Sequence, residues 1–215
     1  HLEYDRPVVA ALAEGGGFVL VGRSYGSIRN STNWSAIAYT ADGTQLWEQS
    51  YAEVRYRTIE VAVIGQAPYF AVSVFAYEGD GRLYVYSAAG ALLWSRPVES
   101  SVTLRADAAG NRIIGIDRGA KVLFIVDART GAEVATVAVS PDAALQVAAT
   151  GHILVIDPAA AVRLDPAGKV LANVADATRY AAIKLAETGD AFFAATGGAD
   201  STVYRYAADG KLAWQ

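Results

Sequence analysis

One short phrase of apolar and polar positions recurs five times along the chain. It consists of an alternating apolar strand, a small polar turn that ends in glycine, and a second short strand. A hairpin built on a type I turn needs a residue at positive φ to rejoin the strand, and glycine adopts that conformation without steric cost. The phrase therefore predicts five hairpins. Their turn glycines are spaced 37 to 47 residues apart, at Gly43, Gly90, Gly131, Gly168 and Gly210.

Two further positions recur around these glycines. A short polar residue begins most of the turns, where its side chain can bond to the turn backbone; these residues are Thr40, Ser87, Asp127 and Asp165. Four residues after each glycine, an outer-strand side chain is expected to point onto the face of the sheet. Those side chains are Trp47, Trp94, Ala135, Ala172 and Trp214.

A second hairpin precedes each of these phrases. In the third period, for example, an apolar alternation over 102–106 turns at Gly110 into a second apolar run over 113–116. Two hairpins per period give four antiparallel strands in 37 to 47 residues, which is typical of a β-propeller blade. We therefore predict an all-β propeller of about five four-stranded blades. Their approximate bounds are 7–50, 51–97, 98–139, 140–176 and 177–215.

Five whole blades leave no strand over. This is consistent with two arrangements, a five-bladed ring closed without strand exchange or part of a larger propeller. The repeats cover essentially the whole chain, so we treat it as a single propeller domain.

Composition excludes several classes of protein. Apolar residues make up 53% of the chain and charged residues 19%, which excludes a disordered segment. The absence of Cys excludes disulfides, thiol nucleophiles and thiolate-bound metals. The net charge of -4 argues against a nucleic-acid partner. No apolar run reaches the roughly 18–20 residues that a membrane helix needs.

The third repeat carries a family resemblance. Residues 124–134, Phe-Ile-Val-Asp-Ala-Arg-Thr-Gly-Ala-Glu-Val, resemble the repeat of PQQ-like (quinoprotein-like) propellers, whose pattern ends in Asp, Gly and an outer-strand Trp. The other four hairpins are similar to it more loosely, and Ala135 and Ala172 replace the Trp in blades three and four. The resemblance implies blades, as also in WD40-like propellers, and a bacterial extracytoplasmic (secreted, cell-surface or periplasmic) scaffold or binding module. Blades alone imply no particular activity.

Polar residues recur on the predicted innermost strands. Matching their apolar neighbours places Glu60, Thr103, Gln146 and Lys184 at one equivalent position, with Ala10 or Ala11 completing the ring. Such a ring can line a water-filled channel and bind a ligand. Alternatively, the residues satisfy one another, with Glu60 opposite Lys184, because a buried charge is costly unless it is paired.

Arginine and tyrosine gather just ahead of two of these strands, at 55–57 and at 179–180. Arginine offers forked donors to anions, and tyrosine offers a flat face for sugars or peptides. The alternative is ordinary solvated loops in which each Arg pairs with a neighbouring acid. The predicted ligand-binding residues are therefore Arg55, Tyr56, Arg57, Glu60, Gln146, Arg179, Tyr180 and Lys184.

Catalytic signatures are weak. The aligned ring supplies one carboxylate, whereas a glycosidase at a propeller axis needs several. His152 lies in a turn, where we expect it to face solvent. We predict no catalytic residue, no metal and no cofactor. The favoured function is a non-enzymatic extracytoplasmic binding or scaffold module with a protein or glycan partner. The alternatives are a carbohydrate-active enzyme or lectin with its site at the propeller axis, or a structural subunit of a larger assembly.

Overall fold

A computed structural model gives the architecture. It describes residues 4–12, 17–25, 32–51, 56–64, 69–76, 81–107, 111–157, 160–175, 180–197 and 200–215. Within these ranges the regular structure consists of strands alone, grouped into five four-stranded antiparallel sheets. In each sheet the strands lie side by side in chain order. The expectation of an all-β propeller with about five four-stranded blades is confirmed.

The sheets are called blades one to five in chain order. Blade one contains β1 (Tyr4–Leu12), β2 (Phe18–Tyr25), β3 (Thr32–Tyr39) and β4 (Gln45–Tyr51). Blade two contains β5 (Tyr56–Ile64), β6 (Tyr69–Ala76), β7 (Gly81–Tyr86) and β8 (Leu92–Val98). Blade three contains β9 (Val102–Asp107), β10 (Arg112–Asp117), β11 (Val122–Asp127) and β12 (Glu133–Ala138). Blade four contains β13 (Ala144–Val147), β14 (Ile153–Ile156), β15 (Ala160–Leu164) and β16 (Val170–Ala175). Blade five contains β17 (Tyr180–Leu185), β18 (Ala191–Gly197), β19 (Asp200–Tyr206) and β20 (Leu212–Trp214).

The repeated turns have the predicted chemistry. All five turn glycines have positive φ, between 72° and 85°. In blade three the Asp127 carboxylate accepts hydrogen bonds from the backbone N–H groups of Arg129 (3.1 Å) and Thr130 (2.8 Å). The Thr130 hydroxyl also donates to it, at 2.7 Å, and together these bonds lower the pKa of Asp127. A local network therefore defines the hairpin.

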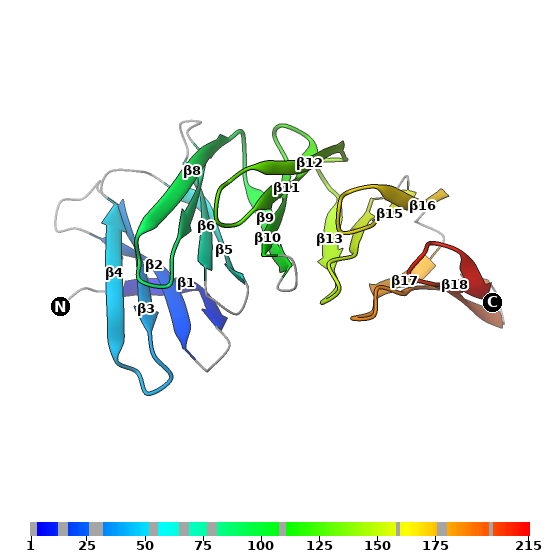
Figure 1. Cartoon of the computed structure of the whole chain (residues 1–215), viewed down its shortest axis with the longest axis horizontal. Helices are drawn as coiled ribbons and strands as arrows, with labels where there is room; N and C mark the ends of the chain where they lie inside the picture. The colour runs from blue at the N-terminus through cyan, green and yellow to red at the C-terminus, as the bar shows by residue number, and fades with distance from the viewer. Residues whose placement is uncertain are drawn as a thin grey trace.

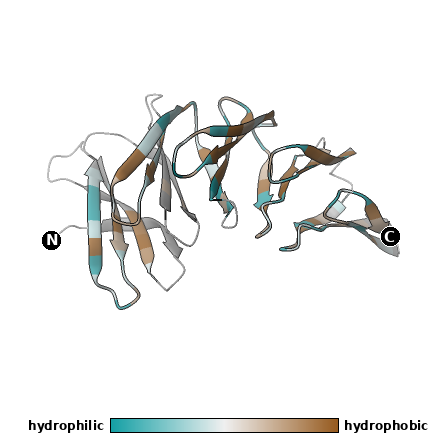
Figure 2. Ribbon diagram, viewed as in Figure 1, coloured by the Kyte–Doolittle hydropathy of each residue, from teal (hydrophilic) through white to brown (hydrophobic). Residues whose placement is uncertain are grey.

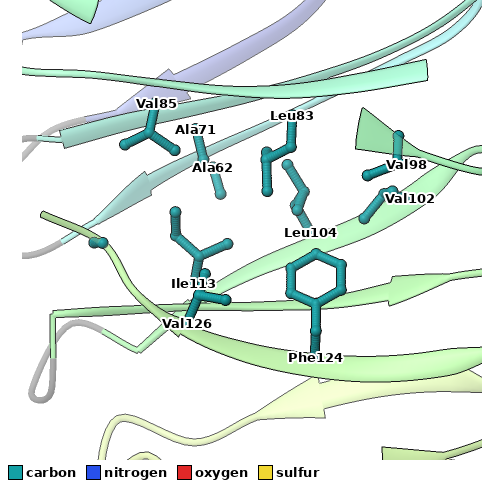
Figure 3. Close-up of a cluster of buried hydrophobic side chains, with 11 residues drawn as sticks. Ala62, Ala71, Leu83, Val85, Val98, Val102, Leu104, Ile113, Phe124 and Val126 are labelled. Atoms are coloured by element: carbon teal, nitrogen blue, oxygen red, sulfur yellow. The ribbon is translucent and has the colours of Figure 1, made fainter. Parts of the chain in front are cut away.

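The hydrophobic core is divided among the junctions between blades. One cluster joins blades two and three, with Leu83 and Val85 on one side and Leu104 and Phe124 on the other (Figure 3). Further clusters join blades three and four and blades four and five. The middle strands of blade three are buried on both faces, which explains the continuous apolar run over 122–126.

The five blades follow one another along an open arc, and blades one and five lie at its opposite ends (Figure 1). Contacts between innermost strands link consecutive blades, from β1 to β5, β9, β13 and β17. Of the two arrangements that the sequence allowed, the closed five-bladed ring is not the one observed. Hydrophobic segments lie within the strands, and hydrophilic residues gather at the hairpin turns (Figure 2).

The outer-strand tryptophans reach beyond their own blade. The Trp47 indole N–H donates to the Ala88 carbonyl in the turn of blade two, at 2.8 Å. The Trp94 indole N–H donates to the Ala128 carbonyl in the turn of blade three, at 2.9 Å. Each ring also covers the turn glycine, because a Cβ added to Gly90 would lie 2.6 Å from Trp47 Cγ. The tryptophan thus fastens one blade to the next.

Where alanine replaces this tryptophan, an arginine from the same blade supplies the donor. The Arg112 guanidinium of blade three donates to the Pro166 carbonyl in the turn of blade four. The Arg163 guanidinium of blade four donates to the Ala207 and Gly189 carbonyls of blade five. Arg163 is only 1% exposed. The departure from the repeat pattern in blades three and four is therefore compensated by another side chain.

A matched pair of glycine substitutions tests this junction. Gly90 and Gly43 have φ values of 80° and 84°, but no described atom lies within 4 Å of a Cβ added at Gly43. We expect Gly43→Ala to lower the free energy of unfolding by about 1–2 kcal/mol through backbone strain alone. Gly90→Ala should cost roughly 1–3 kcal/mol more because its Cβ collides with Trp47. Urea denaturation of both variants measures the difference, and equal losses would contradict the packing role of Trp47.

Candidate functional site

The strand registers define which inner-strand residues are equivalent. In each blade, the outer-strand Trp or Ala pairs with a residue of the third strand, which pairs with one of the second strand, which in turn pairs with one of the innermost strand. We call the five innermost residues reached in this way the inner row. The inner row consists of Ala11, Ala62, Arg105, Gln146 and Lys184. Glu60 and Thr103 lie one step away, two residues earlier on their strands. The predicted single ring of Glu60, Thr103, Gln146 and Lys184 is therefore wrong in register.

Gln146 bridges two inner strands. Its side-chain amide donates to the Ile183 carbonyl at 3.1 Å and accepts from the Leu185 N–H at 2.9 Å. Both partners belong to β17, whereas Gln146 belongs to β13. Because both ends of the amide are used, Gln146 holds blades four and five together.

The two neighbours of Gln146 in the inner row are exposed cations. Arg105 and Lys184 both reach solvent, and Arg105 donates one hydrogen bond of 2.7 Å to the Leu104 carbonyl. Neither forms an ion pair with any carboxylate in the described ranges. Sequence reasoning missed Arg105, although counting back across the hairpins from Ala135 would have found it. This row is the candidate site.

Tyr180 does not belong to a binding face. Its side chain is 8% exposed and lies edge-on to Phe193 and Tyr204, with ring centroids 5.1 Å and 6.0 Å away. It forms part of the core between blades four and five. The prediction that Tyr180 helps to form an exposed recognition surface is wrong, because packing occupies its ring.

The remaining predicted residues are only partly located. Arg55 and Arg179 lie outside the described residues. Tyr56, Arg57 and Glu60 are residues of β5, and only their backbone is among the parts of the chain that the structure describes.

Arg118, in the loop between β10 and β11, has an internal role. One of its guanidinium nitrogens donates to the Pro141 carbonyl, and another donates to the Thr103 hydroxyl at 3.2 Å. These bonds tie the loop to β9 and to the segment that enters blade four.

His152 does not simply face solvent, contrary to expectation. It is partly buried, its Nδ1 lies 3.0 Å from the Thr150 hydroxyl, and its ring fills the space in front of Gly189 in blade five. Burial and the nearby Arg163 cation lower the pKa of His152, and the opposing effect of Asp165 and Asp190 is smaller. His152 is thus another part of the junction between blades four and five.

The described residues contain no group of three or more His, Asp or Glu side chains placed to hold a metal ion. They also contain no helix long and apolar enough to cross a membrane.

Comparisons with known proteins establish the fold. No protein-family model matches the sequence, and no curated protein matches it significantly. Similar solved structures include BamB from Moraxella catarrhalis, with a TM-score of 0.58 and 14% identity over 98% of this chain and 61% of that one. Dihydro-heme d1 dehydrogenase NirN in complex with DHE has a TM-score of 0.55 and 10% identity over 97% of this chain and 54% of that one. Sqt1 from Chaetomium thermophilum has a TM-score of 0.54 and 13% identity, with 94% and 56% covered.

These neighbours support the β-propeller fold, and BamB and NirN are β-propellers. The chain spans between 54% and 61% of the length of these three structures. A dehydrogenase is among them, so likeness of fold does not decide between a binding module and an enzyme.

Replacing Gln146 tests its bridging role. Gln146→Leu keeps the approximate volume but leaves the Ile183 carbonyl and the Leu185 N–H without their partner. We expect a loss of about 1–3 kcal/mol in the free energy of unfolding. Ala182→Gln, at an exposed position on β17, is the control and should change stability by less than about 0.5 kcal/mol. A Gln146→Leu variant as stable as the wild type would show that the bridge is not formed.

The lowered pKa of His152 predicts a pH dependence. Below the ordinary histidine pKa of 6.5, the unfolded chain binds a proton that the folded chain resists, so stability falls as the pH is lowered toward the folded-state pKa. We expect the melting temperature to fall between about pH 7.5 and 5.5. His152→Gln should flatten this dependence, whereas His1→Gln, which replaces the other histidine, should retain it. Equal slopes in wild type and His152→Gln would contradict the assignment.

Proposed function

We propose that this protein is a non-enzymatic β-propeller module that binds an acidic segment of a partner protein along its inner row. The observation that supports this proposal is the pair of exposed cations, Arg105 and Lys184, on either side of the strand that carries Gln146. An extracytoplasmic setting is part of the proposal and is supported by the resemblance of the repeats to PQQ-like propellers.

The inner row is well suited to an extended acidic peptide. Arg105 offers a forked, permanently charged donor set and Lys184 a compact ammonium group, and both project from strands rather than loops. Because neither has an intramolecular ion pair among the described residues, a partner carboxylate need not displace one. The overall charge of -4 makes these cations a local feature, which favours specificity over general attraction of anions.

The other predicted residues extend the proposal toward the opposite end of the inner strands. Arg55, Tyr56, Arg57 and Arg179 precede or begin β5 and β17, and remain predicted contributors there. Glu60 bears on the alternative of a carbohydrate-active enzyme or lectin at the axis, which would need further carboxylates beside it. No contact of the described residues favours that alternative.

A charge-matched pair of double variants tests the inner row. The probe is a fluorescein-labelled poly-L-glutamate peptide, whose binding is measured by fluorescence anisotropy. Combining Arg105→Gln with Lys184→Gln should weaken binding about 3- to 30-fold, since each exposed ion pair contributes up to about 1 kcal/mol. Combining Arg129→Gln with Lys169→Gln removes the same charge from exposed turn residues of blades three and four and should have little effect.

A charge-conserving variant completes the test. Arg105→Lys combined with Lys184→Arg should retain most of the binding, and added salt should weaken it. Equal losses in the two neutralised double variants would show a net-charge effect and contradict the inner-row site. Failure of the wild type to bind the peptide would contradict the acidic partner.

A further inference from the structure

Polar side chains gather on one face of β9, at the junction between blades three and four. Val102 and Leu104 point the other way, into the apolar cluster that blade three shares with blade two (Figure 3). Because successive residues of a strand alternate between its two faces, Thr103 and Arg105 face blade four. The residues that pair with them on β10 belong to the cluster between blades three and four, which agrees with this placement. A hydroxyl and a guanidinium group therefore lie two residues apart on the same face of β9.

A second guanidinium group reaches the same face. Arg118, in the loop between β10 and β11, donates from one nitrogen to the Thr103 hydroxyl at 3.2 Å and from another to the Pro141 carbonyl at the entry to blade four. Its position is therefore fixed on both sides, by blade three and by the segment that enters blade four. We call Thr103, Arg105 and Arg118 the β9 cluster.

The two positive charges of the β9 cluster have no carboxylate partner among the described residues. Asp117 directly precedes Arg118, but its carboxylate accepts three backbone N–H groups instead, at 2.8 to 3.2 Å. Within the described ranges, Arg105 donates one hydrogen bond, to the Leu104 carbonyl at 2.7 Å. Since a guanidinium group has five N–H donors, both arginines keep donors for a further acceptor.

The Thr103 hydroxyl adds another donor to the cluster. Its oxygen accepts from Arg118, so its own proton remains to be donated, and the described part of the chain supplies no acceptor for it. A hydroxyl that accepts from a cation is polarised and becomes a better donor. Three neighbouring groups that all have protons to donate are complementary to an oxyanion.

We propose that the β9 cluster binds one carboxylate, with one oxygen on the Thr103 hydroxyl and Arg118 and the other on Arg105. Two oxygens in one plane match the donor geometry of guanidinium groups. Arg105 is exposed and the other two residues are half-buried, so solvent reaches the cluster. The site stands on these contacts, and only the assignment of the carboxylate to an acidic segment of a partner protein rests on the proposed function. The site also lies within the arc, away from both of its ends (Figure 1).

A matched pair of variants at Thr103 tests the hydroxyl. Thr103→Val keeps the branched shape but removes the donor, whereas Thr103→Ser keeps the donor. With the fluorescein-labelled poly-L-glutamate peptide as the probe, Thr103→Val should weaken binding about 3- to 30-fold, and Thr103→Ser should retain most of it. Arg118→Gln should weaken binding by a similar factor, whereas Arg129→Gln, which removes the same charge from an exposed turn, should not. Urea denaturation of each variant separates lost binding from lost folding.

A small probe separates this site from the proposed function. Glutarate presents carboxylates without a peptide, and at millimolar concentration it should shift the NMR signals of the Arg105 and Arg118 Nε–H groups together in the wild type. Failure of glutarate to shift either signal would overturn the site. If glutarate shifts both signals and the wild type does not bind the peptide, the site stands and the acidic partner segment is contradicted. Wild-type peptide affinity in both Thr103→Val and Arg118→Gln would overturn the site and leave the proposed function intact.

Discussion

The structure depends on the contact between the hairpin turn of one blade and the outer strand of the blade before it. A twisted four-stranded sheet with apolar residues on both faces cannot bury both by itself, so each blade needs a neighbour. The buried clusters lie between blades for this reason. The turn glycine lets the neighbour approach closely, and the adjacent carbonyl gives that neighbour a hydrogen-bond acceptor, which fixes the position of one sheet on the next.

In blades two and three, large and small side chains compensate for one another along the row of paired residues that contains the outer-strand Trp or Ala. In blade two, Trp94 shares its row with the small residues Ala62, Ala71 and Val85. In blade three, Ala135 shares its row with the larger residues Arg105, Ile114 and Ile125. Dense packing favours such compensation at a buried junction, because a row of uniformly small residues leaves a void and a row of uniformly large ones overfills the junction. The loss of a repeat tryptophan is therefore coordinated with its row.

Local signals explain how much the sequence revealed. Turn glycines, short polar turn residues and apolar alternation act over a few positions, and they predicted the hairpins and the blades. The inner row was misaligned because residues i and i+2 of a strand point to the same face and can have the same apolar neighbours. The sequence pattern therefore could not show that Glu60 lies two residues before the position in β5 that is equivalent to Gln146. Irregular pairing in β5 and β17 adds to the ambiguity. The partners of Tyr180, His152 and Arg163 lie on other strands or on the next blade, and no local pattern encodes them.

The junction between blades four and five differs in kind from those at the start of the chain. Arg163, Gln146 and His152 replace the tryptophan, and the Arg163 charge is solvated by backbone carbonyls, with no ion pair to a described carboxylate. A buried cation held in this way is costly if the carbonyls move, so the junction tolerates only a narrow range of blade angles. Blade five carries both kinds of side chain that join blades elsewhere, a tryptophan and an arginine. Trp214 is the tryptophan, and Arg205 pairs with it at the position that Arg163 occupies opposite Ala172 in blade four. Arg205 is paired at 2.8 Å with Asp190, which directly precedes the neighbouring strand, so in blade five the arginine is held within its own blade, whereas Arg163 donates to the next one.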